Sequence, residues 1–98
     1  MSFMRRSDEV RMLALANSFP TLKDVLDLWH DDAPEVLEEW ACGPAATPGG
    51  LAAARFVLAV YNYDAEWKCG RFSMRDISRW DDHHIEAFAA WARDPFWP

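Results

Sequence analysis

Apolar residues recur along the first third of the chain at the spacing of amphipathic helices. From Ser7 to Pro20 they return every three or four positions, which predicts a helix that Ser7 caps and Pro20 ends. Positions 22–29 repeat the i, i+3, i+4, i+7 pattern, and this stripe predicts a second helix from Thr21 to Asp31. Thr21 would cap the second helix, and the carboxylate three residues later would complete a capping box.

A third helix is predicted after the Asp31–Asp32 pair, which ends the second helix and offers caps for the next one. Pro34 suits the first turn, where no backbone N–H is needed, and the Gly43–Pro44 pair ends the helix. The expected core-facing residues of this helix are Val36, Leu37, Trp40 and Ala41.

The segment 51–63, LAAARFVLAVYNY, is apolar on nearly every side. Thr47 and Pro48 suit the start of a helix there, and a helix with this composition should be the buried centre of the fold. A β-strand over 55–63 is the alternative, because aromatic and β-branched residues also suit strands. The alanines before Phe56 favour the helix.

Two further helices are predicted in the second half of the chain. Ser73 and Asp76 form a capping-box pair that opens a short helix through Trp80. Asp81 and Asp82 then cap a last helix, which the Asp94–Pro95 pair ends. Its expected inward residues are Ile85, Phe88, Ala89 and Ala92, with His84 and Trp91 beside them, and the apolar tail Phe96–Trp97 is expected to pack back on the body.

These elements predict a single all-α domain over 1–98, a compact bundle of five or six short helices. Half of the chain is apolar (51%) and it contains six tryptophans, so it can build a core without a metal or a disulfide. No apolar run is long enough to span a bilayer, and the first ten residues do not form a secretory signal. Cys42 and Cys69 are therefore expected to be free thiols in the cytoplasm.

The net charge of −6 disfavours direct binding to nucleic acid or to anionic membranes and favours a protein partner with a basic surface. The excess is local, because the segment from Thr21 to Gly43 holds seven acids against Lys23 alone. If both helices form, their acids lie on adjacent faces and make one negative ridge. The ridge residues are Asp24, Asp27, Asp31, Asp32, Glu35, Glu38 and Glu39. An exposed aromatic beside them, Trp29 or Trp40, would supply an anchor for the partner; a merely solvated face is the alternative.

A basic strip follows in the second half: Lys68, Arg71, Arg75 and Arg79. It could pair with the acidic ridge inside the molecule, or contact a phosphate or an acidic patch of a partner. Aromatic residues lie between these cations, as in single-strand nucleic-acid binders, but the acidic field of the chain disfavours that function.

Metal and cofactor sites are not expected. The two cysteines are 27 positions apart, and the neighbouring side chains of His83 and His84 diverge by about 100° on a helix, so no zinc pattern is present. An enzyme remains an alternative: a small hydrolase that uses His83 or His84, or a thiol enzyme in which Lys68 and Arg71 lower the pKa of Cys69.

A small, acidic, tryptophan-rich helical chain with a ridge from Asp24 to Glu39 resembles, at the level of class, the small inhibitor proteins of phages and mobile elements, such as anti-CRISPR proteins. The resemblance implies an acidic face that occupies a basic nucleic-acid channel; it transfers no site residue, because no motif is matched. The predicted function is a non-enzymatic module that binds a macromolecule. A structural or assembly subunit, dimerising through the Phe96–Trp97 end, is a further alternative.

Overall fold

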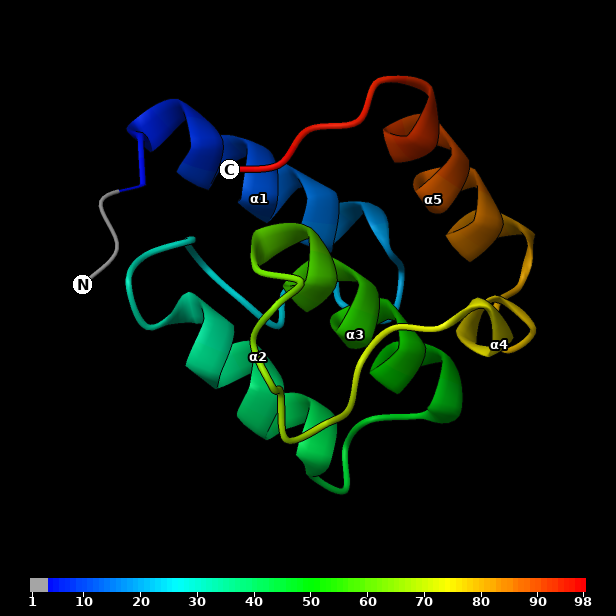
Figure 1. Cartoon of the computed structure of the whole chain (residues 1–98). Helices are drawn as coiled ribbons and strands as arrows, with labels where there is room; N and C mark the ends of the chain where they lie inside the picture. Colours follow the sequence, from blue (N-terminus) through cyan, green and yellow to red (C-terminus); the bar gives the residue numbers. More distant parts are fainter. Residues whose placement is uncertain (1–3) are drawn as a thin grey trace.

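Residues 4–98 are described by a computed structural model, in which five helices and no strand are present (Figure 1). The helices are α1 (Arg6–Ser18), α2 (Ala33–Cys42), α3 (Pro48–Tyr61), α4 (Met74–Ile77) and α5 (Asp82–Arg93). The prediction of a compact all-α bundle of short helices is confirmed.

Helix α3 is the centre of the fold, and the strand alternative for 55–63 is wrong. The Thr47 hydroxyl caps the helix by accepting a hydrogen bond of 3.1 Å from the Gly50 N–H, and Pro48 occupies the first turn. Ala and large apolar side chains are buried on nearly all sides of α3. Figure 1 shows the other helices arranged around it. An all-apolar helix is stable in water only when it is enclosed in this way.

The predicted helix from Thr21 to Asp31 is wrong. This stretch forms isolated turns, in which the N–H groups of Leu22 and Lys23 donate to the Phe19 carbonyl, and Asp24 takes a left-handed φ of 67°. The Thr21 hydroxyl does not cap a helix but bonds the His84 ring. The apolar members of the stripe are still buried, namely Leu22, Leu26 and Trp29. Burial of these side chains, and not helix formation, therefore accounts for the apolar spacing.

Some of the predicted caps and inward residues also differ. Helix α1 begins at Arg6, so Ser7 lies inside it, and Asp32 precedes α2 without a side-chain capping bond. In α2 Leu37 and Ala41 are buried, whereas Val36 is 43% exposed. The stripe is narrower than predicted because α2 contacts its neighbours along one side only.

Helix α5 begins as predicted, because the Asp81 carboxylate accepts a hydrogen bond of 3.0 Å from the His84 N–H. Its fully buried residues are His84 and Ala87, while Ala92 is exposed, which corrects the predicted inward face. His84 is drawn inward because its ring bonds both Asp81 and Thr21. Helix α4 is shorter than predicted and ends at Ile77; the Ser73 N–H donates to the Asp76 carboxylate at its start.

Aromatic side chains fill the space between α3, α4 and α5. The Phe56 ring lies between 5.1 and 6.2 Å from five other aromatic rings, measured between centroids. These belong to Phe19, Phe72, Trp80, Phe88 and Trp91. The tail returns to the body as predicted: the Arg11 guanidinium lies 4.1 Å from the centre of the Phe96 ring. Trp97 is 66% exposed, although its ring contacts Trp91.

Candidate partner-binding surface

Six of the seven predicted ridge carboxylates are exposed. They are Asp24, Asp27, Asp31, Asp32, Glu35 and Glu39, and we call them the acidic surface. Among residues 4–98 the two ion pairs are Arg55–Asp76 and Asp81–His84, so neither neutralises this surface. The predicted arrangement on two helical faces is wrong, because the first three acids lie on the irregular segment before α2.

Glu38 is the exception among the ridge residues. It is half-buried, and its carboxylate accepts a hydrogen bond from the Lys68 backbone N–H. This bond joins α2 to the segment between α3 and α4. Glu38 therefore has a structural role, and only its neighbours Glu35 and Glu39 point their charge to solvent on α2.

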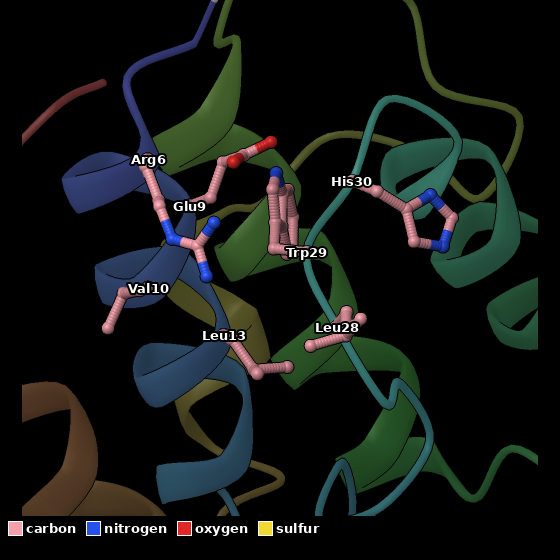
Figure 2. Close-up of a pocket in the computed structure, with 7 residues that line it drawn as sticks. All are labelled: Arg6, Glu9, Val10, Leu13, Leu28, Trp29 and His30. Atoms are coloured by element: carbon pink, nitrogen blue, oxygen red, sulfur yellow. The ribbon is translucent and has the colours of Figure 1, made fainter.

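Trp29 is not an exposed anchor, since only 4% of it is accessible and its ring packs 5.7 Å from Tyr61. It forms a wall of a hollow of about 210 Å³ between α1 and the 28–30 segment, which we call the α1 hollow. Figure 2 shows Leu13 and Leu28 directed toward one another across this hollow. The remaining lining residues are Arg6, Glu9, Val10 and His30. Leu28 is 65% exposed and was not predicted as a contact residue.

Trp40 is half-buried and lines a second, open hollow of about 420 Å³, which we call the α2 hollow. Its lining residues are Val36, Glu39, Trp40, Gly43, Pro44 and Ala45. One edge of the Trp40 indole packs on α3, where a Cβ at Gly50 would lie only 2.9 Å from the ring. The Trp40 indole thus packs on α3 and also lines the hollow. Of the two predicted anchors, Trp40 is therefore the one that lies beside an exposed carboxylate, Glu39, in an open hollow.

The basic strip is exposed at all four positions, Lys68, Arg71, Arg75 and Arg79, but only Arg75 lies on α4. The side chain of Arg71 lies 5.5 Å from the centre of the Tyr63 ring. The predicted pairing of this strip with the acidic ridge is not observed, because Glu38 contacts the Lys68 backbone and not its ammonium group. Of the aromatic residues between these cations, Trp80 is buried in the core, and Trp67 and Phe72 are partly buried against it.

Arg55 and Asp76 form a partly buried ion pair that was not predicted from the sequence. The Arg55 guanidinium donates to the Asp76 carboxylate at 3.0 Å and to the Cys69 carbonyl at 2.6 Å. Asp76 is 2% exposed and also accepts from the Ser73 N–H. A lone arginine inside an apolar helix was the available signal, since a buried charge needs a partner. The pair fixes the segment that connects α3 to α4.

His84 is buried between two oxygen atoms. Its Nδ1 lies 2.8 Å from Asp81 Oδ1, and its Nε2 lies 2.8 Å from Thr21 Oγ1. The hydrogen bonds from His84 hold the pKa of Asp81 below its ordinary value of 3.8. His83 is exposed and does not take part. The three groups join the start of α5 to the segment after α1.

The predicted lowering of the Cys69 pKa is wrong. Cys69 is buried, and burial raises the pKa of its thiol above the ordinary value of 9.0; the nearby Cys42 and Glu38 raise it further, against a smaller opposing effect of Arg55. A thiol of this kind stays protonated at neutral pH and is a weak nucleophile. Over residues 4–98, no three His, Cys, Asp or Glu side chains are grouped so that they could hold a metal ion.

Comparison of the chain with protein-family models, with curated proteins and with solved structures found no match. In the part of the chain that the structure covers, every helix is too short or too polar to cross a membrane.

Proposed function

We propose that this chain is a non-enzymatic module that binds a protein partner with a basic surface, through the acidic surface and the α2 hollow together. The observation that carries the proposal is that Glu39, an exposed carboxylate, lines the same hollow as Val36 and Trp40. A rigid aromatic wall beside unpaired charges suits a contact in which an apolar side chain enters and cations surround it.

The uncompensated charge supports the same function. Within residues 4–98, the acids from Asp24 to Glu39 form no ion pair with a cationic side chain. Complementary charges raise the rate of association with a basic surface and discriminate against other partners. A basic surface that normally binds nucleic acid is the partner that this charge fits best. In that case the chain acts as an inhibitor by competing for the phosphate-binding surface.

The test compares wild type with the double variant Glu35→Lys/Glu39→Lys. Partners are captured from an extract of the native host, and the affinity of the purified partner is then measured at several salt concentrations. We expect binding to weaken by about tenfold or more, with a shallower salt dependence, because two attractive charges become repulsive. Glu38 is left unchanged, because its carboxylate holds the Lys68 N–H.

The matched control is Glu66→Lys/Glu86→Lys, which changes the net charge equally at two exposed positions outside the acidic surface. It should retain nearly all of the affinity. If both double variants bind as well as wild type, the acidic surface is only a solvated face. The inhibitor function requires in addition that the chain displace nucleic acid from the purified partner.

A hydrolase is the second candidate function, and one observation favours it. The Thr21 hydroxyl lies 2.8 Å from the His84 imidazole, which in turn lies 2.8 Å from the Asp81 carboxylate. This order resembles the nucleophile, base and orienting acid of serine hydrolases. His84 is however buried, and neither the α1 hollow nor the α2 hollow is lined by these residues. Labelling of Thr21 by a fluorophosphonate, lost in Thr21→Val, would support the hydrolase; no labelling of the folded chain would reject it.

A further inference from the structure

The two cysteines lie at the same junction of the fold, although 27 positions separate them in the sequence. The Glu38 carboxylate bonds the Lys68 N–H, which brings α2 against the segment that contains Cys69. Cys42 follows Glu38 by one helical turn, and residues four apart on a helix lie on the same face, with Cβ atoms about 5–6 Å apart. Figure 1 shows the segment after α3 crossing the last turns of α2. The Glu38–Lys68 bond therefore holds the segment that contains Cys69 against the end of α2 that contains Cys42.

The electrostatics of Cys69 agree with this placement. The Cys42 thiol is one of the groups that raise the pKa of Cys69, and Glu38 is another. Both groups belong to the end of α2. The pKa of Cys69 thus responds to the same end of α2 that the Glu38–Lys68 bond holds against its segment.

We propose that Cys42 and Cys69 form a reversible disulfide within one chain, which links the end of α2 to the segment between α3 and α4. The oxidant is a low-molecular-weight disulfide. The Cys42 thiolate attacks one of its sulfur atoms, and one small thiolate leaves. The Cys69 thiol then loses its proton to solvent and attacks the Cys42 sulfur of the mixed disulfide, and the second small thiolate leaves. Two protein thiols are oxidised, and one small disulfide is reduced to two thiols.

The order of the two steps follows from exposure. Cys42 is exposed and meets the oxidant first, whereas Cys69 is buried and resolves the mixed disulfide. The second step is slow at neutral pH, because few molecules carry the Cys69 thiolate, and it should accelerate as the pH rises. The Arg55 guanidinium fixes the Cys69 carbonyl, so the adjustment falls on Cys42, the last residue of α2.

The disulfide would also affect the shape of the α2 hollow, because Gly43 and Pro44 line this hollow and directly follow Cys42. The disulfide itself does not depend on the proposed function. Its formation is measured on the isolated chain, without a partner.

The test treats the folded full chain with glutathione disulfide at mildly alkaline pH and follows the intact mass and the thiols open to alkylation after denaturation. We expect a product lighter by two hydrogen atoms, with no free thiol and with one peptide that contains both cysteines; a reductant should restore the starting mass. Cys69→Ser should stop at a mixed disulfide on Cys42. Cys42→Ser should react more slowly than wild type by about tenfold or more, because only the buried thiol remains.

The wild-type result decides the proposal even if a serine variant fails to fold. A mixed disulfide that persists on Cys42 while Cys69 can still be alkylated would overturn it. A covalent dimer as the main product would overturn it too, because the two sulfur atoms would then react between chains instead of within one.

Discussion

The polar side chains inside this small core form hydrogen bonds with other groups of the chain. In the part of the chain from residue 4 onward, no buried side-chain nitrogen or oxygen lacks a hydrogen-bond partner. The Arg55–Asp76 pair and the contacts of His84 with Thr21 and Asp81 are the main examples. A buried polar group without a partner costs about 1–3 kcal/mol. These residues are therefore expected to determine which loops dock against α3 and α5.

The pH dependence of stability tests the Asp81–His84 contact. Asp81→Asn keeps an acceptor for the His84 N–H at the start of α5 but removes the charge beside the ring. In the folded state the pKa of Asp81 is lowered below 3.8, so the folded chain binds this proton less readily than the unfolded chain. The stabilisation is therefore present above pH 3.8 and is lost as the pH falls through the folded-state pKa. We expect wild type to be more stable than the variant at neutral pH, and the two to converge well below pH 3.8.

Urea unfolding at a series of pH values measures this difference. Asp82→Asn is the matched control, because Asp82 is the adjacent exposed carboxylate at the start of the same helix. A difference between wild type and Asp81→Asn that stays constant down to low pH would show that the charge of Asp81 has no role.

At the scale of elements, the segment 19–32 shows how tertiary contacts override a helical pattern. Leu22, Leu26 and Trp29 are buried without a helix. Pro20 supplies no N–H, and the Thr21 hydroxyl is engaged by His84 instead of the backbone. Asp24 then turns the chain through a left-handed conformation that aspartate tolerates better than most residues.

Two substitutions at Asp24 distinguish the observed turn from the predicted helix. Both Asp24→Gly and Asp24→Ala remove the same charge from an exposed position. At the observed φ of 67° glycine is unstrained while alanine is not, so the glycine variant should be the more stable by about 1 kcal/mol. In a helix the order is reversed by about the same amount. Thermal unfolding of the two variants gives the sign, and a more stable alanine variant would contradict the turn.

Most of the helices could be predicted because their ends depend on local chemistry. The Thr47 cap and Pro48 fix the start of α3, and the Asp81 cap fixes the start of α5. The prediction of a helix over 21–31 failed because the Thr21 hydroxyl bonds His84. His84 lies 63 positions after Thr21, so nothing in the local sequence indicates this contact. Helix caps that are made by neighbouring residues can be predicted from the sequence. A hydrogen bond between a potential cap and a residue distant in the sequence cannot.

The candidate site was predicted in part for the same reason. The charge excess and Trp40 are visible in the sequence, but the exposure of Val36 and Leu28 depends on how α2 and the segment before it pack against the rest of the chain. Trp29 was predicted both as a member of the apolar stripe and as a candidate for the exposed anchor, and its ring packs on Tyr61, a residue of α3. Charge can be counted along a sequence, while the side of an aromatic ring that faces solvent is decided by packing.

Across the whole molecule, the aromatic ring cluster and the proposed binding surface lie on different parts of the chain. The ring cluster around Phe56 draws on residues of α3 and α5, on the segments beside α4 and on Phe19 after α1. No residue of α2 takes part in the contacts of this ring found over residues 4–98. The acidic surface and the α2 hollow belong to α2 and its flanking segments. A change in one region should therefore leave the other nearly unchanged.

Phe56→Leu tests this separation together with Glu35→Lys/Glu39→Lys. The leucine removes the edge contacts of one ring with five others, which should cost about 1–3 kcal/mol and lower the melting temperature by roughly 5–15 °C. Below its transition the variant should bind the partner as wild type does, since Trp40 and Glu39 are untouched. The charge variant should show the opposite pattern, with a melting temperature near that of wild type and weakened binding. Near-ultraviolet circular dichroism measures whether each variant is folded, and a binding titration at the same temperature measures its affinity for the partner. If Phe56→Leu weakens binding while it is fully folded, the two regions are coupled through α3, against which the Trp40 indole packs at Gly50.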